Sequence, residues 1–182
     1  DMPFMSYSDP NQALENSVRL MQEGGAMMIK LEGGEDQISI VEHLARHDIA
    51  VCAHLGLKPQ SVHKIGGFKV QGRDKDESDK MLKNAISLQN AGADLILLEC
   101  VPNELGKLIR DKLDIPVIGI GAGPNVDGQI LVLYDVLGIT QGTMPKFVKN
   151  FMFGHDSPLN AIESYVKAVK EGDYPSPEHC FS

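Results

Sequence analysis

Ionisable residues stand at the ends of several short apolar segments in this sequence. Lys30 and Glu32 follow "MMI", His54 ends "IAVCAH", and Glu99 ends "LILLE". Burying a carboxylate without a partner is costly or forces it to take up a proton, so an acid in such a place needs a reason. Residues two apart on a strand point the same way, which places Lys30 and Glu32 on one side. Asp1, directly before "MPF", could belong to the same set.

Each of these residues also has an ordinary structural interpretation. Lys30 and Glu32 could form an ion pair at the rim of a sheet, worth about 0–1 kcal/mol if exposed. His54 could be a hydrogen-bonded core histidine, and Glu99 could extend into solvent. Taken together, four ionisable groups at the ends of three consecutive strands favour a site that binds a ligand and transfers protons.

The elements that must position these residues alternate along the chain. We expect strands at Ala26–Leu31, Ile49–His54, Asp94–Glu99 and Pro116–Ile120, with a weaker one at Gln129–Tyr134. We expect helices at Asp9–Glu23, Glu35–Arg46, Asp76–Asn90, Asn103–Lys112 and Leu159–Glu171. Continuous apolar strands alternating with amphipathic helices are typical of βα units around a parallel sheet buried on both faces. Ligands bind such sheets and barrels at the carboxyl ends of the strands, where the ionisable residues lie.

Local signals mark a helix boundary, a turn and a long loop. Asp9 is a natural N-cap, with Pro10 in the first turn and Gln12 at the capping-box position. The glycines of "IPVIGIGAG" indicate a tight barrel turn first and a weak anion or ligand loop second. The stretch Gly56–Asp76 is long for a βα loop, and on length alone it is equally a functional lid, a ligand-contact segment or a mobile surface excursion.

Composition excludes several classes of partner. The formal charge of -8 argues against nucleic acid and anionic membrane surfaces as partners, because both bind proteins through clustered Lys and Arg side chains. No apolar run approaches the roughly 20 residues of a membrane span, and no leader of the signal-peptide type is visible. The three cysteines, Cys52, Cys100 and Cys180, show no metal-type pairing and are expected to be free, buried thiols in a reducing compartment. We therefore expect a cytoplasmic protein.

The motifs that carry these residues resemble the ketopantoate hydroxymethyltransferase family. The matching motifs, in the order of the family, are "DMPFMSY", "KLEGG", "HLGLKPQSV", "GGFKVQGR", "LECVP", "IPVIGIGAG", "DGQILVLYDVLGI" and "PKFVKNF". They cover essentially the whole chain and are far more specific than a single fingerprint. The resemblance implies a (β/α)₈ TIM barrel, which agrees with the alternation of strands and helices, and a homo-oligomer, commonly a decamer.

The resemblance also implies a reaction and a role for each residue. A hydroxymethyl group would pass from the co-substrate 5,10-methylenetetrahydrofolate to the 2-oxo acid 3-methyl-2-oxobutanoate, giving 2-dehydropantoate in pantothenate biosynthesis. Asp1 and Glu32 match residues of the Mg²⁺ site, and Asp1, Lys30 and His54 match or resemble residues around the 2-oxo acid. Glu99 in "LECVP" matches the proton acceptor that forms a Mg²⁺-stabilised enolate. An apolar setting would make this carboxylate a better base.

The sequence departs from the family pattern at its start. Family members begin with a helix, two βα units and a third strand whose end carries the "DMPF" aspartate, and their second strand ends in an Asp-Ser pair that supplies another metal ligand. Here residue 1 is the metal aspartate itself. We therefore expect residues 1–182 to be one catalytic barrel domain lacking its N-terminal helix and first strand-helix units, and a portion of a longer protein.

Two rival functions stay open. The first is another Mg²⁺-dependent lyase or mutase acting on 2-oxo acids, of the phosphoenolpyruvate mutase type, although the reactive cysteine loop expected in several of these enzymes is not visible. The second is a non-catalytic fragment that contributes to an assembly, whose exposed sheet edges would then need pairing.

Overall fold

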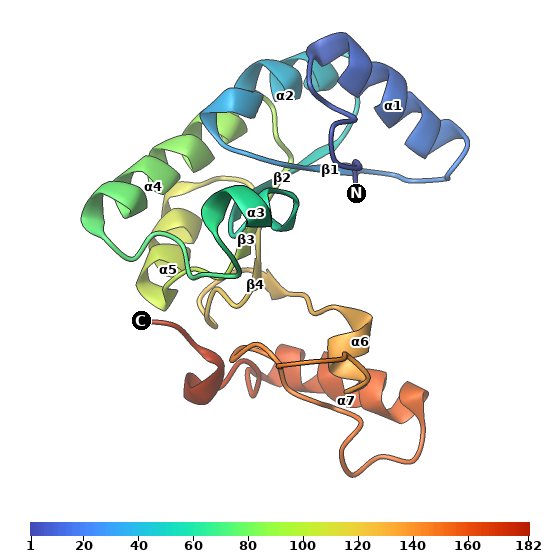
Figure 1. Cartoon of the computed structure of the whole chain (residues 1–182), viewed down its shortest axis with the longest axis vertical. Coiled ribbons are helices and arrows are strands. Elements are labelled where there is room, and N and C mark those ends of the chain that lie inside the picture. The colour runs from blue at the N-terminus through green and yellow to red at the C-terminus, as the bar shows by residue number, and fades with distance from the viewer.

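Residues 1–182 form an α/β fold around one parallel sheet in the computed structural model. The strands are β1 (Ile29–Glu32), β2 (Val51–Gly56), β3 (Leu95–Glu99), β4 (Val117–Ile120) and β5 (Gly128–Gln129). They lie side by side in chain order, and each neighbouring pair is parallel (Figure 1). The α/β class and the parallel sheet predicted from the alternating pattern are therefore confirmed.

Apolar side chains on both faces of the sheet explain the continuous apolar strands. Successive residues of a strand point to opposite faces. Leu31 and Leu98 point to the face that forms the main core, where both are fully buried. Cys52, Leu97 and Ile120 belong to a smaller core formed on the other face. The polar residues at the strand ends continue this second face, because Lys30 pairs in register with Cys52.

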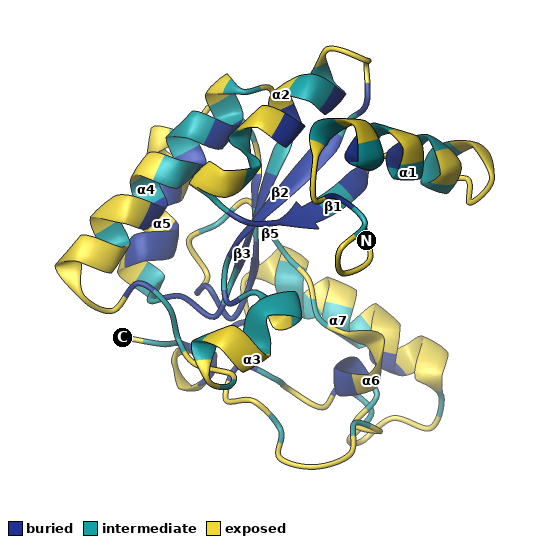
Figure 2. Ribbon diagram, turned by 45° about the horizontal axis from the view of Figure 1, so that its top comes forward, coloured by how far each residue is buried: buried dark blue, intermediate teal, exposed yellow.

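Four helices cover the face of the sheet that carries the main core. They are α1 (Pro10–Gln22), α2 (Ile38–Ala45), α4 (Lys75–Asn90) and α5 (Asn103–Lys112). Figure 1 shows them as an arc around the sheet, and in Figure 2 their dark blue, buried residues lie on the side toward the strands. The remaining helical segments are η1 (Glu35–Gln37), η2 (Pro59–Ser61), α3 (Val62–Ile65), α6 (Leu133–Val136), α7 (Pro158–Glu171) and η3 (Pro177–His179).

Helix boundaries follow the predicted caps closely. The Asp9 carboxylate accepts hydrogen bonds from the backbone N–H groups of Asn11 and Gln12, which satisfies two free donors of α1. The Gln12 side chain accepts from the N–H of Ser8, so the expected reciprocal bond forms one residue before the N-cap. The helix expected at Glu35–Arg46 is divided into a 3-10 turn and α2.

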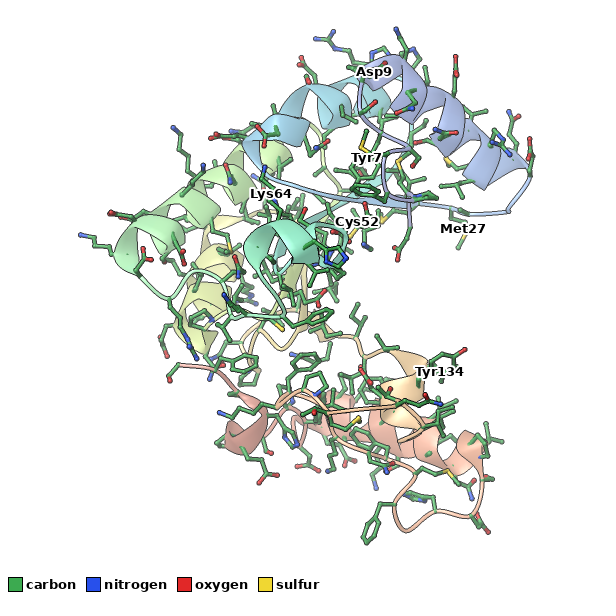
Figure 3. The ribbon with its side chains drawn as sticks, viewed as in Figure 1. Tyr7, Asp9, Met27, Cys52, Lys64 and Tyr134 are labelled. Carbon is green, nitrogen blue, oxygen red and sulfur yellow. The ribbon has the colours of Figure 1, made fainter.

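Three strand predictions were wrong in extent. The second strand, expected at Ile49–His54, is Val51–Gly56. The first strand begins at Ile29, and the exposed side chain of Met27 points away from the chain (Figure 3). The fifth strand is only Gly128–Gln129, and the expected strand at Gln129–Tyr134 is replaced beyond it by α6. The side chain of Tyr134 is exposed to solvent, so its apolar character does not indicate a buried strand. β5 is the last strand of this sheet, so no further strand pairs with the residues after Gln129.

The C-terminal part forms a small core of its own around α6 and α7. Its aromatic centre is Phe151, Tyr165 and Tyr174, whose rings meet edge to face with centroids 5.3 to 6.0 Å apart. Burial raises the pKa of Tyr165 to about 12, so its hydroxyl stays protonated and donates to the carbonyl of Gln129. None of the helices combines the length and apolar character needed to cross a membrane.

Candidate active site

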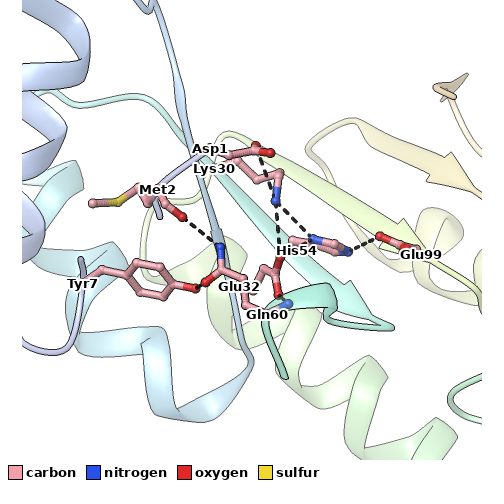
Figure 4. A network of polar contacts seen from close by, with 8 residues as sticks. All are labelled: Asp1, Met2, Tyr7, Lys30, Glu32, His54, Gln60 and Glu99. Carbon is pink, nitrogen blue, oxygen red and sulfur yellow. Dashed lines mark hydrogen bonds and ion pairs between the residues drawn. The ribbon is translucent and has the colours of Figure 1, made fainter. Parts of the chain in front are cut away.

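The predicted ionisable residues meet around the ammonium group of Lys30 (Figure 4). Lys30 Nζ lies 3.4 Å from Asp1 Oδ1, 3.8 Å from Glu32 Oε1 and 3.3 Å from His54 Nδ1. His54 Nε2 lies 3.2 Å from Glu99 Oε2 on the opposite side of the imidazole ring. The structure thus brings together all five residues that the sequence singled out.

The strand register places these side chains at one end of the sheet. Glu32 pairs with His54 across β1 and β2, and Gly56 pairs with Glu99 across β2 and β3. The carboxyl ends of parallel strands meet at the same edge, so residues far apart in sequence converge there. Asp1 joins them because the N–H of Met2 donates to the carbonyl of Lys30 at 2.9 Å, along the free edge of β1.

Burial divides the site into a closed part and an open part. The His54 side chain is 2% exposed and that of Glu99 is 15% exposed, whereas that of Asp1 is 72% exposed. Lys30 supplies one positive charge beside the carboxylates of Asp1 and Glu32, with a third carboxylate, Glu99, behind His54. This excess of negative charge favours binding of a further cation at the open side.

Lys30 favours one tautomer of His54. A protonated lysine has donors only, so the tautomer that suits this contact accepts at His54 Nδ1 and carries its hydrogen on Nε2. The Nε2 hydrogen is on the side of Glu99 Oε2. The imidazole and the carboxylate are close to each other, but they are not aligned for a hydrogen bond. The Glu99 carboxylate therefore keeps free lone pairs with which to accept a proton.

Gln60, Tyr7 and Met2 are site residues that sequence reasoning missed. The backbone N–H of Gln60 donates to Glu32 Oε2 at 3.0 Å, and its side-chain Nε2 donates to the carbonyl of Met2 at 2.9 Å. The hydroxyl of Tyr7 donates to Gln60 Oε1 at 2.6 Å. Burial raises the pKa of Tyr7, which keeps this donor protonated. Two signals were available: Gln60 lies in the long loop and in the motif "HLGLKPQSV", and Met2 and Tyr7 lie in "DMPFMSY".

The residue after Glu99 adopts an unusual backbone conformation. Cys100 has φ 50°, in the left-handed region, which costs a residue with a side chain about 1–2 kcal/mol. Two hydrogen bonds hold it there: its N–H donates to the carbonyl of Ile120, and its carbonyl accepts from the N–H of Gln71, both at 2.9 Å. Such conformations gather at functional sites. The bend lets the chain leave β3 immediately beyond Glu99.

The glycine-rich segment after β4 serves as a tight turn. A Cβ at Gly121, where φ is 65°, would lie 2.7 Å from the ring of Phe147, and one at Gly123 would overlap the side chain of Asn103. These glycines therefore allow close packing of the turn against its neighbours. This matches the first of the two interpretations of "IPVIGIGAG".

Asp1 is the carboxylate at the open side of the site, and the Glu32 carboxylate, whose side chain is only 5% exposed, belongs to the closed part. No group of three or more His, Cys, Asp or Glu side chains is arranged to hold a metal ion. Mg²⁺ is nevertheless bound in many sites by one or two carboxylates, with water and substrate oxygens completing the shell. Glu32 uses Oε2 for Gln60 and presents Oε1 toward Lys30, so one oxygen remains for a cation. Asp1 and Glu32 thus supply oxygen donors of the kind that Mg²⁺ prefers.

The buried thiols should make stability depend on alkaline pH. All three cysteines are free and buried, as predicted. Burial raises the pKa of Cys52 to about 11, against the opposing charge of Lys30, and burial with the charge of Glu99 raises that of Cys100 to about 12. The ordinary thiol value is about 8.5, so above it the unfolded chain releases protons that the folded chain keeps.

We therefore expect the free energy of unfolding to fall as the pH rises from about 8.5 toward 11 or 12. Urea denaturation at several pH values measures this slope. The Cys52→Ala, Cys100→Ala double variant should show a shallower fall, and an identical slope in that variant would contradict the assignment.

Comparisons with known proteins identify the family of the chain. The ketopantoate hydroxymethyltransferase family model matches residues 1–177. The 3-methyl-2-oxobutanoate hydroxymethyltransferase of Alkalilimnicola ehrlichii is 59% identical over 181 residues, which cover 100% of this chain and 65% of the relative. That of Nitrosococcus oceani is 58% identical over 175 residues, covering 96% and 66%. That of Aeromonas hydrophila is 54% identical over 182 residues, covering 100% and 69%.

The chain spans about two thirds of the length of the curated relatives it matches. The fold of the family is a TIM barrel, and the five-stranded parallel sheet is accordingly part of such a barrel. Since the match extends over nearly all of its residues, the chain belongs to the ketopantoate hydroxymethyltransferase family.

Proposed function

We propose that the chain carries the catalytic base and the substrate contacts of a 3-methyl-2-oxobutanoate hydroxymethyltransferase, within a single barrel domain. The reaction transfers a hydroxymethyl group from 5,10-methylenetetrahydrofolate to 3-methyl-2-oxobutanoate and gives 2-dehydropantoate. The observation that carries this proposal is the convergence of three carboxylates, a lysine and a histidine at the carboxyl ends of β1, β2 and β3. The names of the similar proteins support transfer of a hydroxymethyl group to 3-methyl-2-oxobutanoate.

The chain's own residues account for the proton transfer. Glu99 takes a proton from the carbon beside the ketone of the oxo acid, and the electron pair left behind moves toward the keto oxygen. The Lys30 ammonium stabilises the negative charge that develops there, and His54 lies between Lys30 and Glu99. The enolate carbon then bonds to the one-carbon unit of the folate. One water is consumed, and tetrahydrofolate leaves.

Asp1 and Glu32 would hold the Mg²⁺ ion. When bound, this ion supplies Lewis-acid polarisation of the carboxylate and keto oxygens of the oxo acid. Asp1, Lys30 and His54 are proposed contacts of the same substrate. The exposed position of Asp1 at the open side of the site is consistent with a ligand that enters from solvent.

Assembly and location follow from the family and from the thiols. We propose a homo-oligomer, up to a decamer, in the cytoplasm. Several large apolar side chains of the C-terminal part, among them Tyr134 and Phe153, are exposed, as expected for a surface that other copies cover. Three free thiols suit a reducing compartment.

A two-substrate assay tests the proposed reaction against its enzymatic rival. The protein expressed from its native gene should form 2-dehydropantoate and tetrahydrofolate in equal amounts, and only when both 3-methyl-2-oxobutanoate and 5,10-methylenetetrahydrofolate are present with Mg²⁺. A lyase or mutase of the phosphoenolpyruvate mutase type would convert an oxo acid without folate. Folate-independent turnover would therefore overturn the proposal in favour of the rival.

A further inference from the structure

Gln60 links three segments that are distant in sequence. It lies in η2, directly after β2, and its contacts reach the start of the chain and the end of β1 (Figure 4). Its backbone binds the Glu32 carboxylate, and its side-chain amide binds both the carbonyl of Met2 and the hydroxyl of Tyr7. All three partners, Met2, Tyr7 and Glu32, are buried, and the hydrogen bonds themselves are part-buried.

The contact with Glu32 selects which oxygen of that carboxylate faces the site. Oε2 accepts the Gln60 N–H at 3.0 Å, and Oε1 is then directed toward Lys30. The donor is the backbone N–H of Gln60. Its position is therefore determined by the backbone path of the loop and not by the side chain of Gln60.

The contact with Met2 fixes the position of Asp1. The N–H of Met2 is bound to the carbonyl of Lys30, and its carbonyl is bound to Gln60 Nε2, so both backbone polar groups of Met2, one in each of its flanking peptide units, are held. Asp1 is the preceding residue, so this anchoring holds the backbone from which its carboxylate reaches Lys30. The Tyr7 hydroxyl orients the amide, because it donates to Oε1 and leaves Nε2 for Met2.

We propose that Gln60 is a positioning residue that sets the separation of the Asp1 and Glu32 carboxylates, the pair that would receive the divalent cation. This rests on the proposed function, which assigns the cation to that pair. The first part of the long loop, through Gln60, then holds two segments of the site together, and we call it the clamp. It acts neither as a lid nor as a mobile surface excursion. Without the amide, Asp1 loses its fixed distance from Glu32, and cation affinity falls while the base and its neighbours remain in place.

Binding of Mn²⁺ alone, followed by electron paramagnetic resonance of the free ion, tests this role without any turnover. The Gln60→Leu variant keeps the backbone N–H and removes both side-chain contacts. We expect its Mn²⁺ affinity to fall about 10–100-fold, the range typical for loss of a group that orients metal ligands. Tyr7→Phe, a milder change that leaves Gln60 in place, should give a smaller fall. Asp1→Asn serves as the positive control.

Gln71→Leu is the matched negative control. Gln71 lies on the same loop and donates through Nε2 only to the carbonyl of Lys69. Its variant should bind Mn²⁺ as the wild type does. In assays, Gln60→Leu should raise the KM for Mg²⁺ and leave kcat at saturating Mg²⁺ within a few-fold, a split that general loss of folding would not produce.

Each outcome separates the inference from the proposed function. Unchanged Mn²⁺ affinity in Gln60→Leu, in a protein that makes 2-dehydropantoate, overturns the role of Gln60 alone. Weakened Mn²⁺ affinity in a protein that does not make 2-dehydropantoate supports the clamp and overturns the proposed reaction. A wild-type protein that binds no Mn²⁺ overturns the clamp together with the cation pair. If Gln60→Leu does not fold, Tyr7→Phe decides, and unchanged affinity there overturns the clamp.

Discussion

Glu99→Gln should lower kcat by about 10²–10⁴-fold, the contribution typical of a positioned general base. Glutamine keeps the shape of the side chain but cannot take up the proton. Since the side chain of Glu99 is 15% exposed and lies 3.2 Å from His54 Nε2, no other carboxylate stands in the same place. The measurement is the loss of deuterium from substrate labelled at the carbon beside the ketone, which reports proton removal directly.

Substrate binding by Glu99→Gln, unlike proton removal, should be nearly unchanged. Lys30, Asp1 and Glu32 are unchanged in the variant, so the Kd for 3-methyl-2-oxobutanoate in the presence of Mg²⁺ should stay within a few-fold. Glu104→Gln is the matched control, an exposed acid in the first turn of α5, and it should exchange deuterium at the wild-type rate. Deuterium loss at the wild-type rate in Glu99→Gln would show that another group is the base.

Gly56→Ala should be the most destabilising small substitution near the site. Gly56 has φ 89°, which a residue with a side chain rarely adopts, and an added Cβ would overlap the carbonyl oxygen of Glu99. That oxygen also accepts the N–H of Leu57 at 2.8 Å, so it cannot move without loss of the contact between β2 and β3. We expect the free energy of unfolding to fall by more than about 4 kcal/mol, measured by urea denaturation.

Gly25→Ala separates backbone strain from the steric overlap. Gly25 has φ 69°, and an added Cβ there would meet no atom within 4 Å. This control should lose only the strain, about 1–2 kcal/mol. Turnover should fall in Gly56→Ala, because Glu99 is displaced, and should remain normal in Gly25→Ala. Equal losses of stability in the two variants would mean that the approach of Gly56 to Glu99 is unimportant.

The sequence was sufficient for the residues that regular elements position. Glu32 and Glu99 end their strands, Lys30 and His54 lie two residues before the ends of theirs, and parallel pairing brings these parts of the strands together. The helices were predictable for the same reason: Asn103–Lys112 is confirmed at both ends, and Asp9 caps α1 as its side chain suggests. Their roles in catalysis came from the family resemblance and stay predictions.

What the sequence did not reveal depends on contacts between distant segments. The hydrogen bonds of Gln60 with Met2 and Tyr7 join the chain start to a loop more than fifty residues later, and no local pattern reports them. The expected strand at Gln129–Tyr134 failed because apolar character was taken as burial, whereas Leu133 and Tyr134 are exposed. Periodicity cannot tell an apolar surface from an apolar core.

The order of the strands bears on how the chain folds. Ile29 pairs with Val51 and Ile96 with Val117, each across a single helical connection, but Cys52 pairs with Leu95 across both the long loop and α4. The entropy lost on closing a loop grows with its length, by about 0.6 kcal/mol per doubling. Joining β2 to β3 is therefore the entropically most demanding step of sheet formation. This is also the step that brings His54 to Glu99, so this pair of side chains and the centre of the sheet form in one event.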